Sequence, residues 1–278
     1  MKKDSLSNFI LVLILLVGLS LLVYPSFSNY WNEMHQTRAI ANYSSIVAEM
    51  KEEDFSHIWN SAYDYNHSLT KRSNSYLLTE EQAARYPEEL NVTGNGIMGY
   101  VEIPKINVHL PVYHGTSDSV LQVAIGHIDW TSLPVGGEST HCVVSGHRGL
   151  PSARLFTDLD QMTEGDIFLL NVMNQTLTYM VDQVKIVLPH ETEDLLIKEG
   201  EDYCTLVTCT PYGVNSHRML VRGTRIDNIA ESKVIRVTAD AVRIEPILVA
   251  PALAAPILLV MLLMVLFPNP KKKRRNAP

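Results

Sequence analysis

Cys209 stands at a point in the sequence where a thiol could do chemistry. The alternating apolar run 203–208 ends there and gives way to the turn residues Pro211 and Gly213. A side chain at the mouth of such a turn is held by a strand and can still be reached from solvent. A thiolate is a strong nucleophile, so Cys209 could attack a carbonyl carbon. This segment alone is equally consistent with a buried structural cysteine.

A histidine and an arginine occupy comparable positions elsewhere in the chain. His147 follows the apolar run 141–145 and is flanked by glycines, and an imidazole can act as acid and base near neutral pH. Arg218 lies near the start of the run 217–226, and its planar cation can hold carbonyl oxygens or an oxyanion. Taken singly, such residues are usually structural or surface residues. Together with Cys209 they predict an acyl-transfer site.

The elements that must position these residues are predicted to be helical first and extended afterwards. Apolar residues recur at helical spacing over 40–65, and Thr79 with Gln82 forms a capping-box pattern before a short helix that ends at Pro87. From residue 91 onward, short β-prone runs alternate with turns, which favours a barrel or sandwich. The expected strands cover 99–103, 108–113, 141–145, 167–172, 177–181, 184–188, 204–208 and 217–226, with helical turns at 118–124, 153–159 and 193–197.

Two apolar segments near the ends of the chain predict membrane spans. Residues 9–23 are almost entirely aliphatic, and 247–267 form a second charge-free stretch; each is close to the roughly 20 apolar residues that cross a bilayer. Basic residues precede the first segment and follow the second, so both termini are expected in the cytoplasm and the region between them outside. A cleaved signal peptide is the alternative for the first segment, although 25–28 is a poor cleavage site.

The charge of the region between the spans argues against nucleic acid as a partner. The chain carries a net charge of −7 and its two termini carry +1 and +5, so the segment between them carries about −13. A nucleic-acid-binding protein would need a basic face.

The cysteine content leaves at least one free thiol, because the chain has only Cys142, Cys204 and Cys209. No spacing typical of a zinc site is present, and we expect no metal and no cofactor. If the runs that carry Cys142 and Cys204 are neighbouring parallel strands, these two cysteines could approach each other. Buried free thiols are the favoured interpretation.

The segment around Cys209 resembles the nucleophile-to-arginine segment of sortases, especially that of the class C, pilus-building branch. Residues 205–218 read TLVTCTPYGVNSHR, and the resemblance continues through most of 96–226 in the family's order. The other matching segments are GYVEIPKINVHLPVYHGT (99–116), GHIDWTSLPVGG (126–137), SGHRGLPSARLFTDL (145–159) and LVRGTRI (220–226). The resemblance implies a mainly β fold, a closed eight-stranded barrel with short helices, preceded by N-terminal helices and flanked by two transmembrane helices.

This architecture predicts seven segments along the chain. They are a cytoplasmic N-terminus (1–7), a transmembrane helix (8–25), an extracellular helical or lid-like region (26–95), the catalytic barrel (96–230), a connector (231–245), a second transmembrane helix (246–268) and a basic cytoplasmic tail (269–278).

The resemblance also implies a reaction and its residues. His147, Cys209 and Arg218 are the expected catalytic residues, and Thr208 and Thr210 are expected to contact the substrate. Cys209 would cleave a Leu-Pro-x-Thr-Gly-like sorting signal between Thr and Gly, and the thioacyl enzyme would pass the acyl group to an amine. The expected partners are a pilin or surface protein that carries the signal and an amine acceptor, most naturally a pilin lysine.

Three alternatives remain open from the sequence. Within the family, the enzyme could anchor surface proteins to a cell-wall peptide. Outside it, the chain could be a non-enzymatic, membrane-tethered binding domain, or a hydrolytic cysteine protease, although papain-like signatures are missing.

The sequence departs from the class C pattern at the lid. Class C sortases usually carry an Asp-Pro-aromatic tripeptide upstream of the barrel, and no Asp-Pro pair occurs in this chain. The corresponding segment, 70–85, reads TKRSNSYLLTEEQAAR. Either Tyr76 or Leu77 covers the site in another way, or the site is open.

Overall fold

The computed structural model describes residues 2–72, 76–228, 257–258 and 260. The chain divides into two units, one formed by Met1–Trp31 with Thr238–Pro278 and the other by Asn32–Val237. The predicted connector (231–245) and basic tail (269–278) lie outside the described residues, as does nearly all of the second predicted span (246–268).

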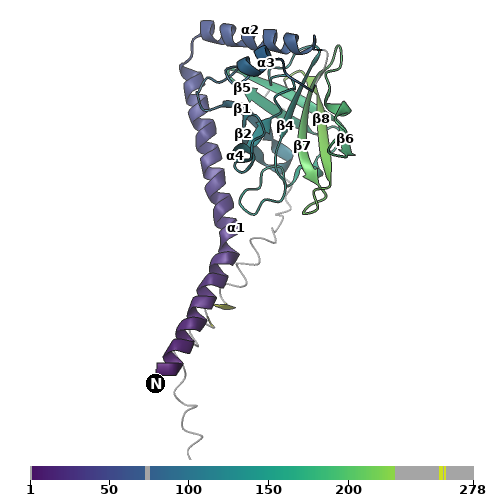
Figure 1. The fold of residues 1–278 in the computed structure, drawn as a ribbon. Helices are drawn as coiled ribbons and strands as arrows, with labels where there is room; N and C mark the ends of the chain where they lie inside the picture. Colours follow the sequence, from purple (N-terminus) through teal and green to yellow (C-terminus); the bar gives the residue numbers. More distant parts are fainter. Residues whose placement is uncertain (1, 73–75, 229–256, 259, 261–278) are drawn as a thin grey trace, which may run out of the picture. The chain divides into compact units, whose positions relative to one another are not determined.

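The first predicted span lies within helix α1 (Lys2–Glu49), drawn in purple in Figure 1. From Phe9 onward this helix is long and apolar enough to cross a membrane, with a mean hydropathy of 2.6 over its most apolar window. None of that window is buried in the protein. A helix that is apolar on all sides and exposed is stable when lipid surrounds it. Among the described residues, one helix therefore has the length and composition of a membrane span.

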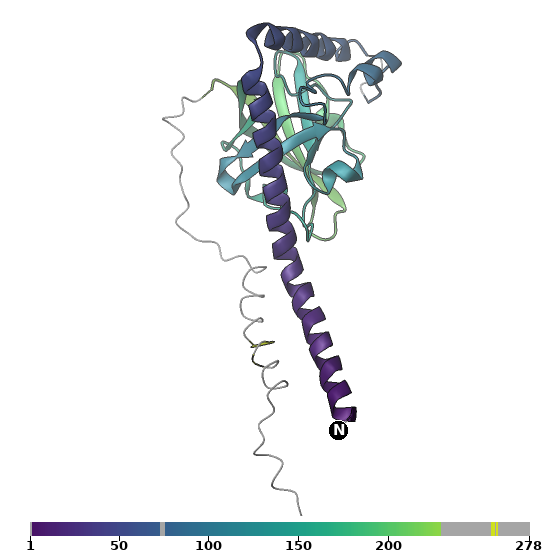
Figure 2. The same ribbon diagram turned by 90° about the vertical axis from the view of Figure 1, so that its left-hand side faces the viewer.

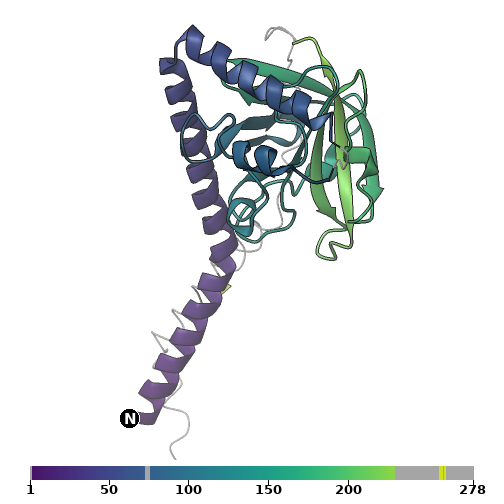
Figure 3. The same cartoon turned by 45° about the horizontal axis from the view of Figure 1, so that its top comes forward.

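The helical spacing over 40–65 predicts the last part of α1 and helix α2 (Glu52–Leu69), and residues 32–49 of α1 pack on the barrel together with α2. Figures 2 and 3 show α2 across one end of the barrel and this part of α1 along its side. The Tyr43 hydroxyl fixes α1 because it donates to the Met98 carbonyl (3.2 Å) and accepts from the Met173 backbone N–H (2.7 Å). Helix α3 (Glu80–Arg85) begins at the predicted capping box.

Eight strands close into a barrel, which confirms the predicted fold class for this part of the chain. The strand order is β1-β2-β3-β4-β7-β8-β6-β5 (Figure 1). The strands are β1 (Ile97–Ile103), β2 (Val108–His114), β3 (Ile125–His127), β4 (Thr140–Ser145), β5 (Ile167–Val172), β6 (Gln175–Val187), β7 (Asp202–Thr210) and β8 (His217–Ile226). The short helix α4 (Asp118–Leu121) and the 3₁₀ turns η1 (Pro104–Ile106), η2 (Leu159–Gln161) and η3 (Glu193–Leu195) connect them.

The structure differs from the sequence predictions at three places. The runs 177–181 and 184–188 form the single strand β6, which carries a β-bulge at Asp182. The Asp182 carboxylate accepts two hydrogen bonds from Arg222 on β8, so the polar residue between the two predicted runs is part of the sheet. Strand β3 was not predicted because it has only three residues. Within the expected helical segment 153–159, turns cover only 155–158, and the 3₁₀ turn η2 begins at Leu159.

Strands β4 and β7 run side by side and parallel, in register from Thr140 opposite Asp202 to Ser145 opposite Val207. The register pairs Cys142 directly with Cys204, and both are free, buried thiols, as the favoured interpretation expected. A hydrogen bond with Cys142 and burial hold the pKa of Cys204 well above its usual value. Cys204 is therefore protonated and is not a nucleophile.

The barrel carries apolar side chains on both faces of β4 and β7. Alternate residues point inward, so Val144 and Leu206 join the main core. The intervening Val143 and Val207 point outward and pack with residues from β6, β8 and the loop between β6 and β7. We call this second group the outer cluster, which consists of Val143, Val187, Leu195, Val207 and Leu220, with Ile128 and Trp130 against it.

His141 fastens the β6–β7 loop to the outer face. Its Nδ1 lies 3.0 Å from the Leu196 carbonyl oxygen, and its Nε2 lies 2.7 Å from Thr205 Oγ1 on β7. A neutral ring satisfies both contacts, since Nδ1–H donates and Nε2 accepts. Burial is the main reason that the pKa of His141 is lowered to about 4.

We predict that acid destabilises the barrel through His141. The unfolded histidine has a pKa of about 6.5, so between pH 6.5 and pH 4 the unfolded state binds more protons. Stability is then complete above pH 6.5 and falls as the pH drops, by about 2 kcal/mol between pH 7 and pH 5. Urea unfolding of the full-length protein followed by tryptophan fluorescence measures this loss. His141→Gln should flatten the pH dependence, and an equally steep loss in that variant would contradict the assignment.

Candidate active site

Cys209 and Arg218 face each other across the β7–β8 ladder. They are directly opposite residues of the antiparallel pair, and both are partly buried. Side chains opposite each other in such a pair lie on the same face, with Cβ atoms about 5 Å apart. Val207, two residues before Cys209, belongs to the outer cluster, so the thiol and the guanidinium lie on the outer face of the barrel.

The turn between β7 and β8 anchors the Arg218 side chain. Its Nη1 donates to the carbonyl oxygens of Asn215 (3.2 Å) and His217 (3.1 Å). Asn215 adopts a left-handed backbone conformation, with φ of 59°, which turns the chain back into β8. Within the described part of the chain, the guanidinium has no other hydrogen-bond partner. Its remaining N–H groups can be offered to a carbonyl oxygen or an oxyanion.

The end of β4 brings His147 to the same edge of the barrel. The Gly146 N–H donates to the Val207 carbonyl (3.0 Å), and the Thr208 hydroxyl donates to the Gly146 carbonyl (2.8 Å). The residue before His147 is thus joined to the two residues before Cys209. The structure therefore brings the three predicted catalytic residues to one edge, and their roles stay a prediction.

Both glycines around His147 are required by close packing. A Cβ atom on Gly146 would lie 2.8 Å from side-chain atoms of Ile125 and Phe156. Gly149 has a φ of +75°, and a Cβ atom there would lie 2.8 Å from the Tyr212 ring. The loop that carries His147 is therefore wedged between the barrel and the β7–β8 turn.

The two threonines next to Cys209 make hydrogen bonds inside the protein. Thr208 is buried, and its hydroxyl is the donor to the Gly146 carbonyl. Thr210 is also buried, and its Oγ1 accepts a hydrogen bond from Arg148 Nη1 (3.4 Å). In this arrangement both hydroxyls hold the site together, and their predicted contact with substrate stays a prediction.

Arg148 is a residue that the sequence did not single out. Its side chain is only 9% exposed, and its Nη2 forms an ion pair with Asp160. The guanidinium also lies over the Tyr212 ring, 6.0 Å from the centroid, and Nη1 bonds to Thr210. Its Nε is buried and has no hydrogen-bond partner among the described residues. Arg148, the residue after His147, is thus hydrogen-bonded to Thr210, the residue after Cys209.

The segment expected to carry a lid lies on the loop between β3 and β4. The Tyr76 ring packs edge-on against Trp130, with centroids 5.3 Å apart. Arg72 donates to the carbonyl oxygens of Trp130 (2.8 Å) and Leu77 (3.3 Å) and so ties the two segments together. Trp130 packs against the outer cluster, and Tyr76 therefore lies near that end of the barrel's outer face.

The described residues contain no group of three or more His, Cys, Asp or Glu side chains that could hold a metal ion. The chemistry of this edge is that of a thiol, an imidazole and a guanidinium. Fold and site together are those expected of a cysteine transpeptidase built on a closed β-barrel.

Comparison with known proteins identifies the family. The model of the sortase domain matches residues 101–226. The structure of sortase C1 from Streptococcus agalactiae shares 50% identity and a TM-score of 0.67, covering 69% of this chain and 100% of that one. Sortase C from Streptococcus pneumoniae shares 45% identity and a TM-score of 0.63, covering 69% of this chain and 98% of that one. The chain belongs to the sortase family, and these two structural neighbours are class C sortases.

Curated relatives from other branches are more distant. Sortase D of Bacillus subtilis is 30% identical over 131 residues, which cover 46% of this chain and 63% of that protein, or less than two thirds of its length. Sortase A of Streptococcus agalactiae is 24% identical over 218 residues, covering 75% of this chain and 82% of that protein.

We predict that Arg148→Gln lowers transpeptidase kcat about tenfold, because the loops carrying His147 and Cys209 lose their bridge. KM should change little, and Arg148→Lys, which keeps the charge without the planar fork, should recover only part of the rate. Steady-state kinetics over a range of pH provide the measurement. Arg154→Gln, in the same loop but paired with Asp158 near the surface, is the matched control. An unchanged kcat in Arg148→Gln would refute the positioning role.

We predict that Thr208→Val lowers the free energy of unfolding by about 1–2 kcal/mol, because the Gly146 carbonyl loses its hydroxyl donor. Thr208→Ser, which keeps the hydroxyl, should remain close to the parent protein. Urea denaturation and KM are measured on the same samples. A rise in KM at unchanged stability would instead favour the predicted contact of Thr208 with substrate.

Proposed function

We propose that this protein cleaves a Leu-Pro-x-Thr-Gly-like sorting signal between Thr and Gly and transfers the new acyl group to an amine. Cys209 is the nucleophile, His147 the acid and base, and Arg218 the group that holds the substrate carbonyl. The observation that carries the proposal is the position of Cys209 opposite Arg218, with Gly146, the residue before His147, bonded to the adjoining residues of β7.

The first half of the reaction breaks the Thr–Gly bond. A free cysteine is only about 3% ionised at pH 7, and a neighbouring imidazolium raises the thiolate fraction. The Cys209 sulfur attacks the Thr carbonyl carbon and forms a tetrahedral oxyanion. The C–N bond then breaks, the electron pair leaves on the Gly nitrogen, and His147 supplies its proton. The product is a thioester on Cys209.

Arg218 suits the stabilisation of this oxyanion. Its Nη1 is occupied by the carbonyl oxygens of Asn215 and His217, which fix the plane of the guanidinium before substrate arrives. A donor aimed in advance at a developing charge contributes about 3 kcal/mol in related acyl-transfer sites. The same donors could hold the substrate backbone.

The second half of the reaction transfers the acyl group to an amine. The amine attacks the thioester carbon while His147 accepts its proton, and the thiolate of Cys209 leaves. We propose a pilin lysine as the acceptor, because the chain is 50% and 45% identical to two class C structures, one of them a sortase C whose structure bears on pilin substrate specificity. The competing acceptor is the amine of a cell-wall peptide.

We also propose that the barrel acts outside the cell membrane with both termini in the cytoplasm. The apolar, exposed first part of α1 supports a span at 8–25. Basic residues before this segment and after 246–268 support the orientation and the second span. The helical region 26–95 and the barrel 96–230 then form the outer part of the protein.

We predict that full-length protein in detergent forms a thioacyl adduct with a Leu-Pro-x-Thr-Gly peptide, detected by intact-protein mass spectrometry. Cys209→Ala should lose the adduct and lower activity at least about 10⁴-fold, because the nucleophile is gone. Cys142→Ala, which removes a buried thiol, should keep the adduct. Added together, a pilin-derived lysine peptide and a wall-peptide amine compete, and we expect the lysine amide to dominate.

Folded protein that yields neither adduct nor amide with any sorting peptide would refute the transpeptidase proposal. If the wall-peptide product dominates, the transpeptidase reaction still stands, but the acceptor is the amine of a cell-wall peptide and not a pilin lysine.

A further inference from the structure

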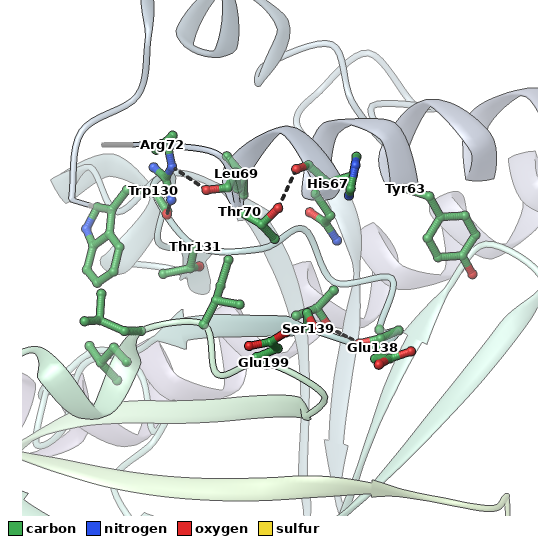
Figure 4. Close-up of a pocket in the computed structure, with 17 residues that line it drawn as sticks. Tyr63, His67, Leu69, Thr70, Arg72, Trp130, Thr131, Glu138, Ser139 and Glu199 are labelled. Atoms are coloured by element: carbon green, nitrogen blue, oxygen red, sulfur yellow. Dashed lines mark hydrogen bonds between the residues drawn. The ribbon is translucent and has the colours of Figure 1, made fainter. Parts of the chain in front are cut away.

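A cavity of about 690 Å³ lies apart from Cys209, His147 and Arg218. The end of α2, the β3–β4 loop and the β6–β7 loop form its walls (Figure 4). Its lining includes Tyr63, Trp130, Arg72, Glu138 and Glu199. None of the residues assigned to the proposed reaction lines it.

The free charge in this cavity is negative. Glu138 and Glu199 are exposed, and within the described residues their carboxylates form no hydrogen bond or ion pair. Arg72 also lines the cavity, but its guanidinium already donates hydrogen bonds to the carbonyl oxygens of three residues. These are Leu69, Leu77 and Trp130.

Aromatic rings complete the lining. Figure 4 shows Tyr63 on the α2 side and Trp130 on the β3–β4 loop, with Glu138 and Glu199 on the side away from α2. A lysine or arginine side chain matches this composition, because its aliphatic stem packs on aromatic rings while its charge meets carboxylates.

The cavity adjoins the outer cluster. Trp130 and Leu195 line the cavity and also pack in or against the outer cluster, which reaches Val207, two residues before Cys209. Thr140, another lining residue, pairs with Asp202, seven residues before Cys209 on β7. The far end of the cavity is therefore about 23 Å from Cys209 along the strands, at about 3.3 Å per residue.

A sorting signal bound at Cys209 would extend toward this cavity. Its apolar Leu and Pro precede the Thr at which cleavage occurs, and the outer cluster is the apolar surface that borders Cys209. With the Thr at Cys209, the Leu lies about 10 Å away, and about four further extended residues reach the far end of the cavity.

We propose that this cavity is an exosite that binds the substrate segment preceding the sorting signal and takes a lysine or arginine side chain from it. The inference rests on the proposed function, because the sorting signal sets the direction of the peptide. Such an exosite would make the enzyme select substrates by the charge of residues outside the Leu-Pro-x-Thr-Gly motif.

The test compares three peptides on full-length protein in detergent. One contains only the Leu-Pro-x-Thr-Gly motif, and the others add an upstream flank with either Lys or Glu about four residues before the Leu. We expect the Lys flank to give a kcat/KM about three- to tenfold above that of the Glu flank, with the difference shrinking at high salt. Equal values for the two flanks, with the short peptide still cleaved, would overturn the exosite and leave the proposed function standing.

Charge reversal tests whether the cavity itself is responsible. Glu138→Lys with Glu199→Lys should reverse the preference, so that the Glu flank becomes the better substrate. A folding defect cannot produce such a reversal, because it would slow all peptides alike. Glu164→Gln, which changes an exposed acid outside the lining, should keep the parent preference.

Two further outcomes would refute the inference. In the first, kcat/KM depends on the charge of the acceptor amine peptide and does not depend on the charge of the sorting-peptide flank. The cavity would then bind the amine acceptor. Failure to cleave even the short peptide would refute the proposed function and the exosite with it.

Discussion

The parallel pairing of β4 with β7 is the constraint on which the site depends. Parallel strands end at the same edge of a sheet, so the loop after Ser145 and the last residues of β7 emerge together. The antiparallel return of β8 then brings Arg218 to the level of Cys209. Barrel closure fixes both pairings, because each of these strands is hydrogen-bonded on both sides. His147, Cys209 and Arg218, which are far apart in the chain, thereby lie at the same end of the barrel.

The alternation of side chains along β7 places its two cysteines in different environments. Cys204 and Cys209 are five residues apart, so they point to opposite faces of the barrel. Cys204 is buried in the core against Cys142 and stays protonated, whereas Cys209 is partly exposed on the outer face beside Arg218. The same residue type on the same strand is therefore inert at one position and available for reaction at the other.

The sequence predicts most of the barrel, because its strands are apolar runs bounded by turns, and it predicts the candidate residues, because the segment around Cys209 is distinctive. It does not predict β3, which is too short to show a period, or the bulge at Asp182, which depends on Arg222 in another strand. Arg148 and the cavity lined by Glu138 and Glu199 were missed for a related reason. Their properties arise from contacts between loops that only the closed barrel brings together.

A closed barrel also limits how a peptide can be recognised. Within the described residues every barrel strand pairs with a neighbour on both sides, so only the ends of strands, such as 108–111 of β2, leave backbone with which a substrate could extend the sheet. Selectivity must then come from side chains and from the loops over the outer face. These loops tolerate changes in length and charge that the strands beneath them do not. Related enzymes can thus diverge in the cargo they accept while the edge that carries the thiol stays the same.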